Sequence, residues 1–264
     1  MNNLSSSGAD MNMCFVVPVY KHGSTLEDVV VSLLEFKCPI IVVDDGNGER
    51  DRELIEKCAQ NHKEVILITF EKNRGKGAAV FAAVRRAHKE GFTHIFQVDS
   101  DGQHDSGRCR DFMALAEKYP DSIICGYPEY DESVPLARKN GREFSNGWAR
   151  LVSWRPGIKD VLCGFRIYPV KPFIRVLNTS IYLNRRMGFD AEILVRMLWI
   201  NTGLVNEAVH VTYPKDGISN FRMVGDNVTI SFTFARLCAG MIIRSPLLLL
   251  RLFIRKIFLT GRDL

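Results

Sequence analysis

The sequence predicts an α/β protein built on a doubly wound, mainly parallel sheet. In the first half of the 264-residue chain, short apolar runs rich in Val and Ile alternate with amphipathic segments long enough to form helices. This alternation is typical of βαβ units, whose helices cover both faces of a parallel sheet. A chain of this length can bury a large core, and its hydrophobic fraction of 46% and charged fraction of 25% are those of an ordinary globular protein.

The elements of the first half follow from apolar periodicity. Compact apolar runs predict strands at 13–19, 40–43, 65–70, 94–98 and 122–125. Helical spacing of apolar residues predicts helices at 24–36, 51–61, 77–90 and 106–119. Ser24 and Glu27 have the spacing of a capping box, so the first helix is predicted to start there.

Beyond residue 127 the regular alternation ends. We expect a helix at 136–153, a strand at 164–168, a helix at 190–200 and a strand at 204–213. No linker rich in Gly, Ser or Pro separates the halves, so one domain is predicted over 13–223, with halves at 13–127 and 128–223. A flexible leader at 1–12 and a basic, amphipathic helical tail at 224–264 complete the chain.

Residues 236–264 of the tail account for the whole net charge of +5, because they hold six Arg or Lys and one Asp. Arg236 and Arg244 keep every uncharged stretch of the tail far below the roughly 20 residues of a spanning helix. We therefore expect a helix lying in the membrane interface. The alternatives are a buried C-terminal helix and an oligomer contact. Because the excess of positive charge is confined to the tail, we also predict no nucleic-acid partner.

The cysteines and the N-terminus indicate the compartment. Seven cysteines, an odd number with no closely spaced pair, indicate neither a disulfide framework nor a zinc knuckle. Residues Met1 to Asp10 are polar and do not resemble a signal peptide. Together with the tail, these features predict a cytoplasmic protein, peripheral on the inner face of the cell membrane.

Two acidic loops carry the candidate chemistry. Asp44 and Asp45 follow one predicted strand, and Asp99 and Asp101 follow another. The carboxyl ends of parallel strands form the edge where open α/β sheets bind ligands. Carboxylates there suit Mg²⁺ or Mn²⁺ bridging phosphate oxygens, so Asp99 and Asp101 are predicted to hold the ion. Asp44 or Asp45 would accept hydrogen bonds from a base or ribose. A solvated Asp-Gly turn is the alternative.

Five short motifs occur in order along the chain. They are Val-Val-Pro-Val-Tyr at 16–20, Val-Asp-Asp-Gly at 43–46, Asn-Arg-Gly-Lys-Gly at 73–77, Asp-Ser-Asp-Gly-Gln-His at 99–104 and Cys-Gly-Phe-Arg at 163–166. This ordered set resembles family 2 glycosyltransferases, with the dolichyl-phosphate mannose synthase type as the nearest variety. The resemblance implies a GT-A fold with a nucleotide-sugar cleft, and an inverting, metal-dependent transfer of one sugar.

The resemblance also implies roles for individual positions of the donor-binding half, 13–127. The positions implied for the nucleotide sugar, a UDP- or GDP-sugar, are Pro18, Tyr20, Asp44, Asp45, Lys76, Asp99 and Ser100. The positions implied for the Mg²⁺ or Mn²⁺ ion are Asp99, Asp101, Gln103 and His104. For Lys76 a solvated charge, and for His104 a capping or packing role, are the alternatives.

The half at 128–223 is expected to bind a lipid-linked acceptor. A polyprenyl phosphate has an oxygen that is already anionic, so it needs no base, and arginines would orient it through charge-assisted hydrogen bonds. The candidates are Arg138, Arg142 and Arg166. A hydroxyl acceptor needs a general base, for which Asp190 is the first candidate and Glu192 the second. Arg142 on a solvated helix face and Asp190 as a helix N-cap are the alternatives.

The segment at 213–222 and the tail also resemble glycosyltransferases of bacterial aryl-polyene and related lipid pigment pathways. That resemblance implies a lipid or polyene hydroxyl as acceptor.

Two other functions compete with glycosyl transfer. The Asp99-x-Asp101-Gly motif matches the opening motif of haloacid-dehalogenase-type phosphatases, but that family places it near the first strand and needs a later acidic pair. A non-catalytic peripheral membrane scaffold is the second alternative. It predicts liposome binding through the tail without metal-dependent nucleotide binding.

Overall fold

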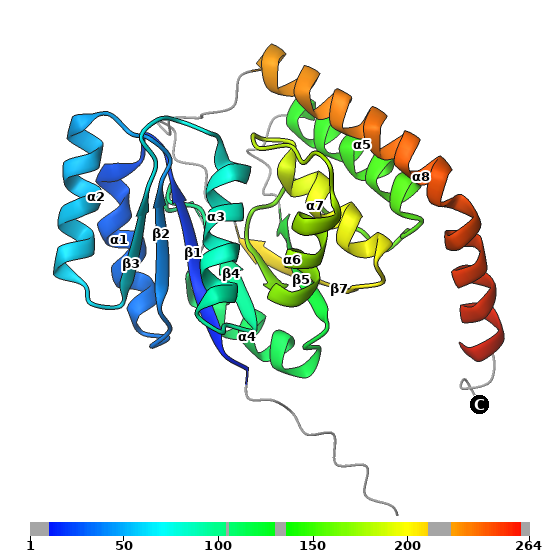
Figure 1. Cartoon of the computed structure of the whole chain (residues 1–264), viewed down its shortest axis with the longest axis horizontal. Helices are drawn as coiled ribbons and strands as arrows, with labels where there is room; N and C mark the ends of the chain where they lie inside the picture. Colours follow the sequence, from blue (N-terminus) through cyan, green and yellow to red (C-terminus); the bar gives the residue numbers. More distant parts are fainter. Residues whose placement is uncertain (1–10, 104–105, 130–135, 211–222, 260–264) are drawn as a thin grey trace, which may run out of the picture.

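A computed structural model describes residues 11–103, 106–129, 136–210 and 223–259, and it has the predicted α/β architecture (Figure 1). Its central sheet contains seven short strands. They are β1 (Met13–Val19), β2 (Ile40–Asp44), β3 (Val65–Thr69), β4 (His94–Gln97), β5 (Ser122–Glu129), β6 (Arg166–Pro169) and β7 (Gly203–His210).

The strands are arranged in the order β3-β2-β1-β4-β6-β5-β7. β1 pairs in parallel with β2 and β4, β2 with β3, and β5 with β7. β6 runs antiparallel to both β4 and β5. The sheet is therefore mainly parallel, as predicted, and the carboxyl ends of β1 to β4 lie along one edge.

Helices lie between the strands along the chain, and one more follows the last strand. They are α1 (Gly23–Leu34), α2 (Glu49–Asn61), α3 (Lys76–Lys89), α4 (Cys109–Lys118), α5 (Leu136–Ser153), α6 (Val170–Thr179), α7 (Phe189–Trp199) and α8 (Met223–Leu259). A short 3-10 helix, Ser106–Arg108, precedes α4.

Strand alternation divides the core into two layers. Along β1, Phe15 and Val17 face the layer formed with α1, α2 and α4, whereas Cys14 and Val16 face the layer formed with α3, α5, α6 and α7. All four side chains are fully buried. This two-sided cover leaves the edge of the sheet, where the strands end, as the place for ligands.

The first helix differs from the prediction. α1 begins at Gly23 with His22 as its N-cap residue, so the predicted capping box at Ser24 and Glu27 is wrong. The amide of Gly23 donates instead to Asp51 Oδ1 at 3.1 Å. A side chain of α2 therefore provides the hydrogen-bond acceptor for a backbone amide at the start of α1, where the capping box was expected to provide one.

The second half differs in two details. The segment that follows β6 forms a helix, α6, which the sequence analysis did not predict. Of the strand predicted at 204–213, residues 204–210 belong to β7, and the rest lies outside the described residues.

The helical tail is confirmed as the single helix α8, which runs along α5 and then extends past it (Figure 1). Its first half packs on the domain through Ile230, Phe234 and Leu237, which are buried. Farther along, Ile242 and Ile243 are 66% and 78% exposed. By length and composition, Val228–Leu250 is one candidate membrane span in the described part of the chain, with a mean hydropathy of 1.5 and 22% of its window buried.

Candidate active site

The two acidic loops lie on the same edge of the sheet. Asp44 is the last residue of β2, Asp45 follows it, and Asp99 follows β4. β1 lies between these two strands, so about two strand spacings, roughly 10 Å, separate the loops. The sequence-based expectation that these carboxylates share one edge is confirmed.

Asp45 fixes the loop that leads into α3. Its carboxylate accepts hydrogen bonds from the side-chain amide of Asn73 at 2.8 Å and from the backbone amides of Arg74 and Gly75 at 2.7 and 2.9 Å. Burial raises the pKa of Asp45, and the two backbone hydrogen bonds act in the opposite direction. Gly75 has a positive φ of 97°, and a Cβ there would lie 2.4 Å from the carbonyl oxygen of Arg185. The motif at 73–77 thus needs glycine at this position.

Lys76, the next residue, joins the two loops. Its Nζ atom lies 2.6 Å from Asp99 Oδ1 and 3.7 Å from Asp190 Oδ2. Burial alone would lower the pKa of Lys76, but Asp190 and Asp99 overcome this effect and raise it. Lys76 therefore carries its charge between two carboxylates, and the solvated-charge alternative is wrong.

Asp190 lies in the first turn of α7 with only 4% of its surface exposed. Its Oδ1 accepts a hydrogen bond from Gln97 Nε2 at 3.3 Å. Burial raises the pKa of this carboxyl, while Lys76 and then Arg166 oppose the rise. The structure thus places the predicted base beside the donor-side residues, within reach of the same lysine as Asp99.

Asp44 has partners inside the protein. Its Oδ1 accepts hydrogen bonds from the backbone and side-chain amides of Asn47 at 2.9 and 2.7 Å, and its Oδ2 lies 3.4 Å from Arg52 Nε. Gly46 follows with a φ of 68°, and a Cβ there would lie 2.2 Å from the carbonyl carbon of Lys72. Asp44 and Asp45 therefore shape the two loops of the donor side.

The remaining predicted donor positions lie at the same edge. Pro18 is buried in β1, where it pairs with Val43, and Tyr20 follows β1 with intermediate exposure. Ser100 is 3% exposed, and its carbonyl oxygen accepts a hydrogen bond from Thr25 Oγ1 at 2.6 Å. Pro18 and Tyr20 thus lie at the end of the strand between the two acidic loops, and Ser100 belongs to one of these loops.

The described metal candidates offer oxygen ligands in one short loop. Asp101 Oδ1 accepts a hydrogen bond from the backbone amide of Gln103 at 3.1 Å. A Cβ at Gly164 would lie 2.6 Å from Asp99 Oδ2 and 2.7 Å from Lys76 Nζ, so glycine keeps open the space beside this carboxylate. A cradle lined by carboxylate oxygens fits Mg²⁺ or Mn²⁺. The predicted ligand His104 lies outside the described residues.

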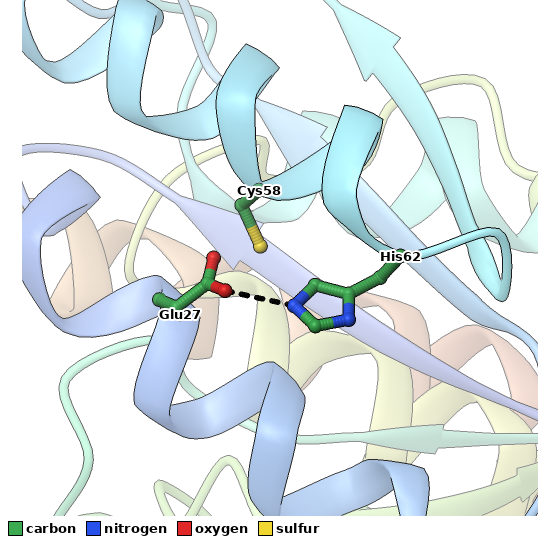
Figure 2. Close-up of side chains that lie close together, drawn as sticks. All are labelled: Glu27, Cys58 and His62. Atoms are coloured by element: carbon green, nitrogen blue, oxygen red, sulfur yellow. Dashed lines mark hydrogen bonds and ion pairs between the residues drawn. The ribbon is translucent and has the colours of Figure 1, made fainter.

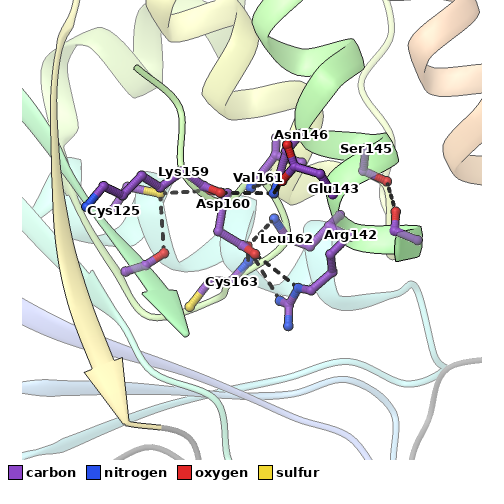
Figure 3. Close-up of polar contacts among 12 residues, drawn as sticks. Cys125, Arg142, Glu143, Ser145, Asn146, Lys159, Asp160, Val161, Leu162 and Cys163 are labelled. Atoms are coloured by element: carbon purple, nitrogen blue, oxygen red, sulfur yellow. Dashed lines mark hydrogen bonds and ion pairs between the residues drawn. The ribbon is translucent and has the colours of Figure 1, made fainter. Parts of the chain in front are cut away.

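Arg142 belongs to a second polar cluster, at the end of β5 (Figure 3). Its Nε lies 3.1 Å from Asp160 Oδ2. The other oxygen of Asp160 accepts hydrogen bonds from the backbone amides of Leu162 and Cys163 at 2.8 and 2.6 Å. Arg142 is thereby held at a pocket of about 100 Å³, which is lined by Tyr127, Pro128, Lys139, Arg142, Glu143, Asn146, Lys159 and Asp160.

Arg166 lies between this pocket and the acidic loops. It is fully buried, and its guanidinium donates to the carbonyl oxygens of Asp190 at 2.9 Å and Asp160 at 3.4 Å. This arrangement makes Arg166 a residue that positions both sides of the site from within the core. For Arg138, the third candidate arginine, the structure describes the backbone, in the first turn of α5.

Glu192, the second candidate base, has its carboxylate engaged away from Asp190. It accepts hydrogen bonds from Arg196 Nη2 at 2.8 Å, from Arg236 Nη2 at 2.9 Å and from the backbone amide of Asn184 at 2.8 Å. Glu192 is 1% exposed. Both of its carboxylate oxygens are therefore occupied by partners inside the protein, so its place in the structure does not support a role as base.

Two further residues at the site were missed by the sequence analysis. Asp160 orients Arg142, and Gly164 gives access to Asp99. Asp160 could have been found from its position three residues before Cys163. An Asp in a turn often accepts hydrogen bonds from the backbone amides that follow it. Gly164 lies inside a quoted motif, but its closeness to Asp99 depends on the pairing of β4 with β6.

Known proteins share both sequence and fold with this chain. A dolichyl-phosphate beta-glucosyltransferase of Dictyostelium discoideum is 28% identical over 248 residues, covering 83% of this chain and 73% of the relative. A polyprenol monophosphomannose synthase of Mycolicibacterium smegmatis is 22% identical over 220 residues, covering 81% of each chain.

Among solved structures, a glucosyl-3-phosphoglycerate synthase of Mycobacterium tuberculosis, in complex with Mn²⁺, UDP-glucose and phosphoglyceric acid, aligns with a TM-score of 0.65. The two share 14% identity, and the alignment covers 88% of this chain and 81% of the synthase. This likeness concerns the fold. The model of the family Glycosyl transferase family 2 matches residues 14–177, more than half of the chain. The chain therefore belongs to glycosyltransferase family 2.

Proposed function

We propose that this glycosyltransferase moves one sugar, with inversion, from a UDP- or GDP-sugar to a lipid-linked acceptor. The observation that carries the proposal is the position of Lys76, whose ammonium lies between Asp99 and Asp190 at the carboxyl edge of the sheet. One cation and two carboxylates at this edge match what a diphosphate leaving group and an incoming nucleophile require. Family membership leaves the phosphatase and scaffold alternatives without support.

On the donor side, Lys76 would contact the diphosphate, and the loops shaped by Asp44 and Asp45 would contact the nucleoside. Asp99, Asp101 and Gln103 would hold Mg²⁺ or Mn²⁺, which supplies positive charge to stabilise the leaving diphosphate. Lys76 is held by Asp99 at 2.6 Å, so it is already oriented when the donor arrives. Such preorganised charge stabilises a transition state without reorganisation at the moment of reaction.

On the acceptor side, the pocket at the end of β5 suits an anion. Its lining contains three cationic side chains, those of Lys139, Arg142 and Lys159, and two carboxylates. Asp160 holds Arg142 in a fixed orientation, so one guanidinium is ready to bind a phosphate oxygen. We therefore favour a polyprenyl phosphate as acceptor, in keeping with the names of the two relatives. A lipid or polyene hydroxyl remains the alternative.

The two acceptors give Asp190 different roles. With a phosphate acceptor, the attacking oxygen carries its own charge, and Asp190 acts by positioning Lys76. With a hydroxyl acceptor, Asp190 takes the proton as the bond to the sugar forms. Burial raises the pKa of Asp190, which makes it a stronger base once it is ionised. Transfer to polyprenyl phosphate and to the matching free polyprenol separates the two cases.

Donor binding can be tested by thermal unfolding. A ligand that binds the folded state raises the Tm. We expect UDP or GDP to raise the Tm in the presence of Mn²⁺ and the shift to disappear in Asp101→Ala. Asp28→Ala, which removes an exposed carboxylate on α1, is the matched control. An undiminished Mn²⁺-dependent shift in Asp101→Ala would contradict the metal assignment.

The acceptor pocket can be tested by steady-state transfer to polyprenyl phosphate. We expect Lys159→Gln and Arg142→Gln to raise the KM for the acceptor while the nucleotide-induced Tm shift stays unchanged. Lys159 is exposed, so its substitution leaves the Asp160 network intact. Lys171→Gln, which removes an exposed lysine from α6 outside the pocket lining, is the control. Equal acceptor KM values in all four proteins would exclude the pocket as the phosphate site.

The tail is proposed to lie on a membrane surface, and the protein to work on the inner face of the cell membrane. Exposed apolar residues on α8 include Ile242, Ile243, Leu249 and Leu250. Arg236 is bound to Glu192, and this contact would be lost if α8 crossed the bilayer. We expect Ile242→Gln with Ile243→Gln to reduce sedimentation with anionic vesicles, whereas Val31→Gln, exposed on α1, should not.

A further inference from the structure

A group of metal-binding side chains lies away from the donor and acceptor sites, between α1 and α2 (Figure 2). It consists of Glu27, Cys58 and His62. One ligand atom from each of these residues lies within 4.8 Å of the other two. This group has no part in the proposed glycosyl transfer.

The geometry of the two helices brings these side chains together. Cys58 lies in the last turn of α2, and His62 is the C-cap residue that follows the helix, four positions later. Glu27 comes from α1, and its Oε1 lies 2.8 Å from His62 Nε2. Figure 2 shows the carboxylate, the thiol and the imidazole turned toward one another. Two elements thus supply three ligands.

The chemistry of the three ligands is that of a zinc site. Thiolate, imidazole and carboxylate are the groups that bind Zn²⁺, and three protein ligands leave a fourth position for water. Cys58 is buried, whereas the side chains of His62 and Glu27 are 17% and 47% exposed, so an ion can enter from the solvent side. An ionised thiolate and an ionised carboxylate would neutralise the two charges of the ion.

We propose that Glu27, Cys58 and His62 bind Zn²⁺ and thereby fix α1 to α2. The consequence reaches the acidic loop, because Thr25, two residues before Glu27, donates a hydrogen bond to the carbonyl oxygen of Ser100 at 2.6 Å. A metal that immobilises the start of α1 therefore also holds Thr25, which binds the Asp99–Asp101 loop, in place. The proposed ion is structural and distinct from the ion at Asp99 and Asp101.

The test uses the full-length protein, stripped of metal, and two probes. Zn²⁺ affinity is measured by competition with a chromophoric chelator, and Co²⁺ is used as a spectroscopic substitute, because a thiolate ligand gives a sulfur-to-metal charge-transfer band that oxygen ligands do not. We expect Zn²⁺ binding, a thiolate band with Co²⁺ and a rise in Tm with Zn²⁺. His62→Gln and Glu27→Gln should each weaken Zn²⁺ binding at least tenfold.

Matched variants make the outcome decisive. Cys58→Ser should abolish the charge-transfer band, whereas Cys38→Ser, at a cysteine outside the cluster, should retain it. Asp101→Ala should retain both the band and the zinc-induced rise in Tm, which separates this site from the donor-side ion. Absence of a thiolate band in the native protein, or unchanged Zn²⁺ affinity in both His62→Gln and Glu27→Gln, would overturn the proposal. Glu27 is half-exposed and its substitution leaves the core intact, so a folding defect cannot obscure the result.

Discussion

Replacing Lys76 with Met should turn a balanced set of charges into an unbalanced one. Lys76 Nζ lies 2.6 Å from Asp99 Oδ1 and 3.7 Å from Asp190 Oδ2. It is also the main charge that opposes the burial-driven rise in the pKa of Asp190. Methionine keeps an unbranched apolar side chain near Phe189, over whose ring the lysine lies, but removes the charge. The variant therefore isolates the electrostatic role of the residue.

The expected size of the effect follows from these distances. At an effective dielectric constant of about 20, two unit charges 3.7 Å apart attract each other by about 4 kcal/mol. The desolvation of the buried ammonium cancels part of this attraction. Removing one partner of a fully buried ion pair costs about 3–5 kcal/mol. The side chains of Lys76 and Asp99 are still 20% and 24% exposed, so we expect a net loss of about 2 kcal/mol in the free energy of unfolding at neutral pH.

The loss should grow as the pH rises. Because burial raises the pKa of Asp190 above that of the unfolded chain, its ionisation removes stability as the pH rises from the unfolded-state pKa through the folded-state pKa. Without Lys76 the folded-state pKa is higher still. The variant should therefore have nearly the same free energy of unfolding as the native protein at acid pH, where the carboxyl is protonated in both. Toward neutral pH its free energy of unfolding should become lower than that of the native protein.

Urea unfolding followed by circular dichroism, over a series of pH values from acid to neutral, measures this difference. Lys171→Met removes an exposed lysine from α6 and should change stability by less than about 0.5 kcal/mol at every pH. If Lys76→Met lowers the free energy of unfolding by the same amount at all pH values, the reasoning is refuted, because such a loss would arise from packing. The absence of any loss would refute it as well.

Three further predictions concern single residues. Gly164→Ala should displace Lys76 from Asp99 and weaken the nucleotide-induced Tm shift, because the new Cβ would lie 2.6 Å from Asp99 Oδ2. Gly157→Ala, whose new Cβ would have no atom within 4 Å, should leave the Tm shift unchanged. Glu192→Gln should lower the free energy of unfolding, measured with urea, by about 2 kcal/mol, because it removes the charge partner of Arg196 and Arg236. Glu143→Gln, at a side chain that is 62% exposed, should change the free energy of unfolding little. Burial lowers the pKa of His94, so the native protein should lose stability as the pH falls through the unfolded-state pKa of about 6.5. Over the same pH range, His94→Gln should lose less stability than the native protein.

The sheet and its acidic edge were predictable because their signals are local. A run such as Ile40–Asp44 specifies a buried strand, and the carboxylates that follow it must lie at the end of that strand. The parallel order of β1 to β4 then brings Asp45 and Asp99 to one edge. Each step needs a few neighbouring residues and one general rule of topology.

The details that escaped prediction depend on contacts between distant residues. Glu27 was expected to cap its own helix, but His62, which is 35 positions away, holds it. Arg166 was expected to reach the acceptor, but the antiparallel pairing of β6 with β4 places it opposite Gln97 in the core. Asp160 was not considered, because its role appears when α5 brings Arg142 against it. A single sequence does not specify these partners.

The tail and the catalytic edge are mechanically connected, which decides how the tail should be probed. Thr233 Oγ1 on α8 accepts a hydrogen bond from Asn184 Nδ2 at 2.8 Å, and Arg236 holds Glu192, whose carboxylate also binds the backbone amide of Asn184. The carbonyl oxygen of Asn184 in turn packs so closely on Gly77 that a Cβ there would lie 2.8 Å from it. Truncation before Thr233 would therefore release the segment that supports the first turn of α3, where Lys76 lies. Substitutions of outward-facing residues of α8 leave that support in place, so they separate membrane binding from catalysis where a truncation cannot.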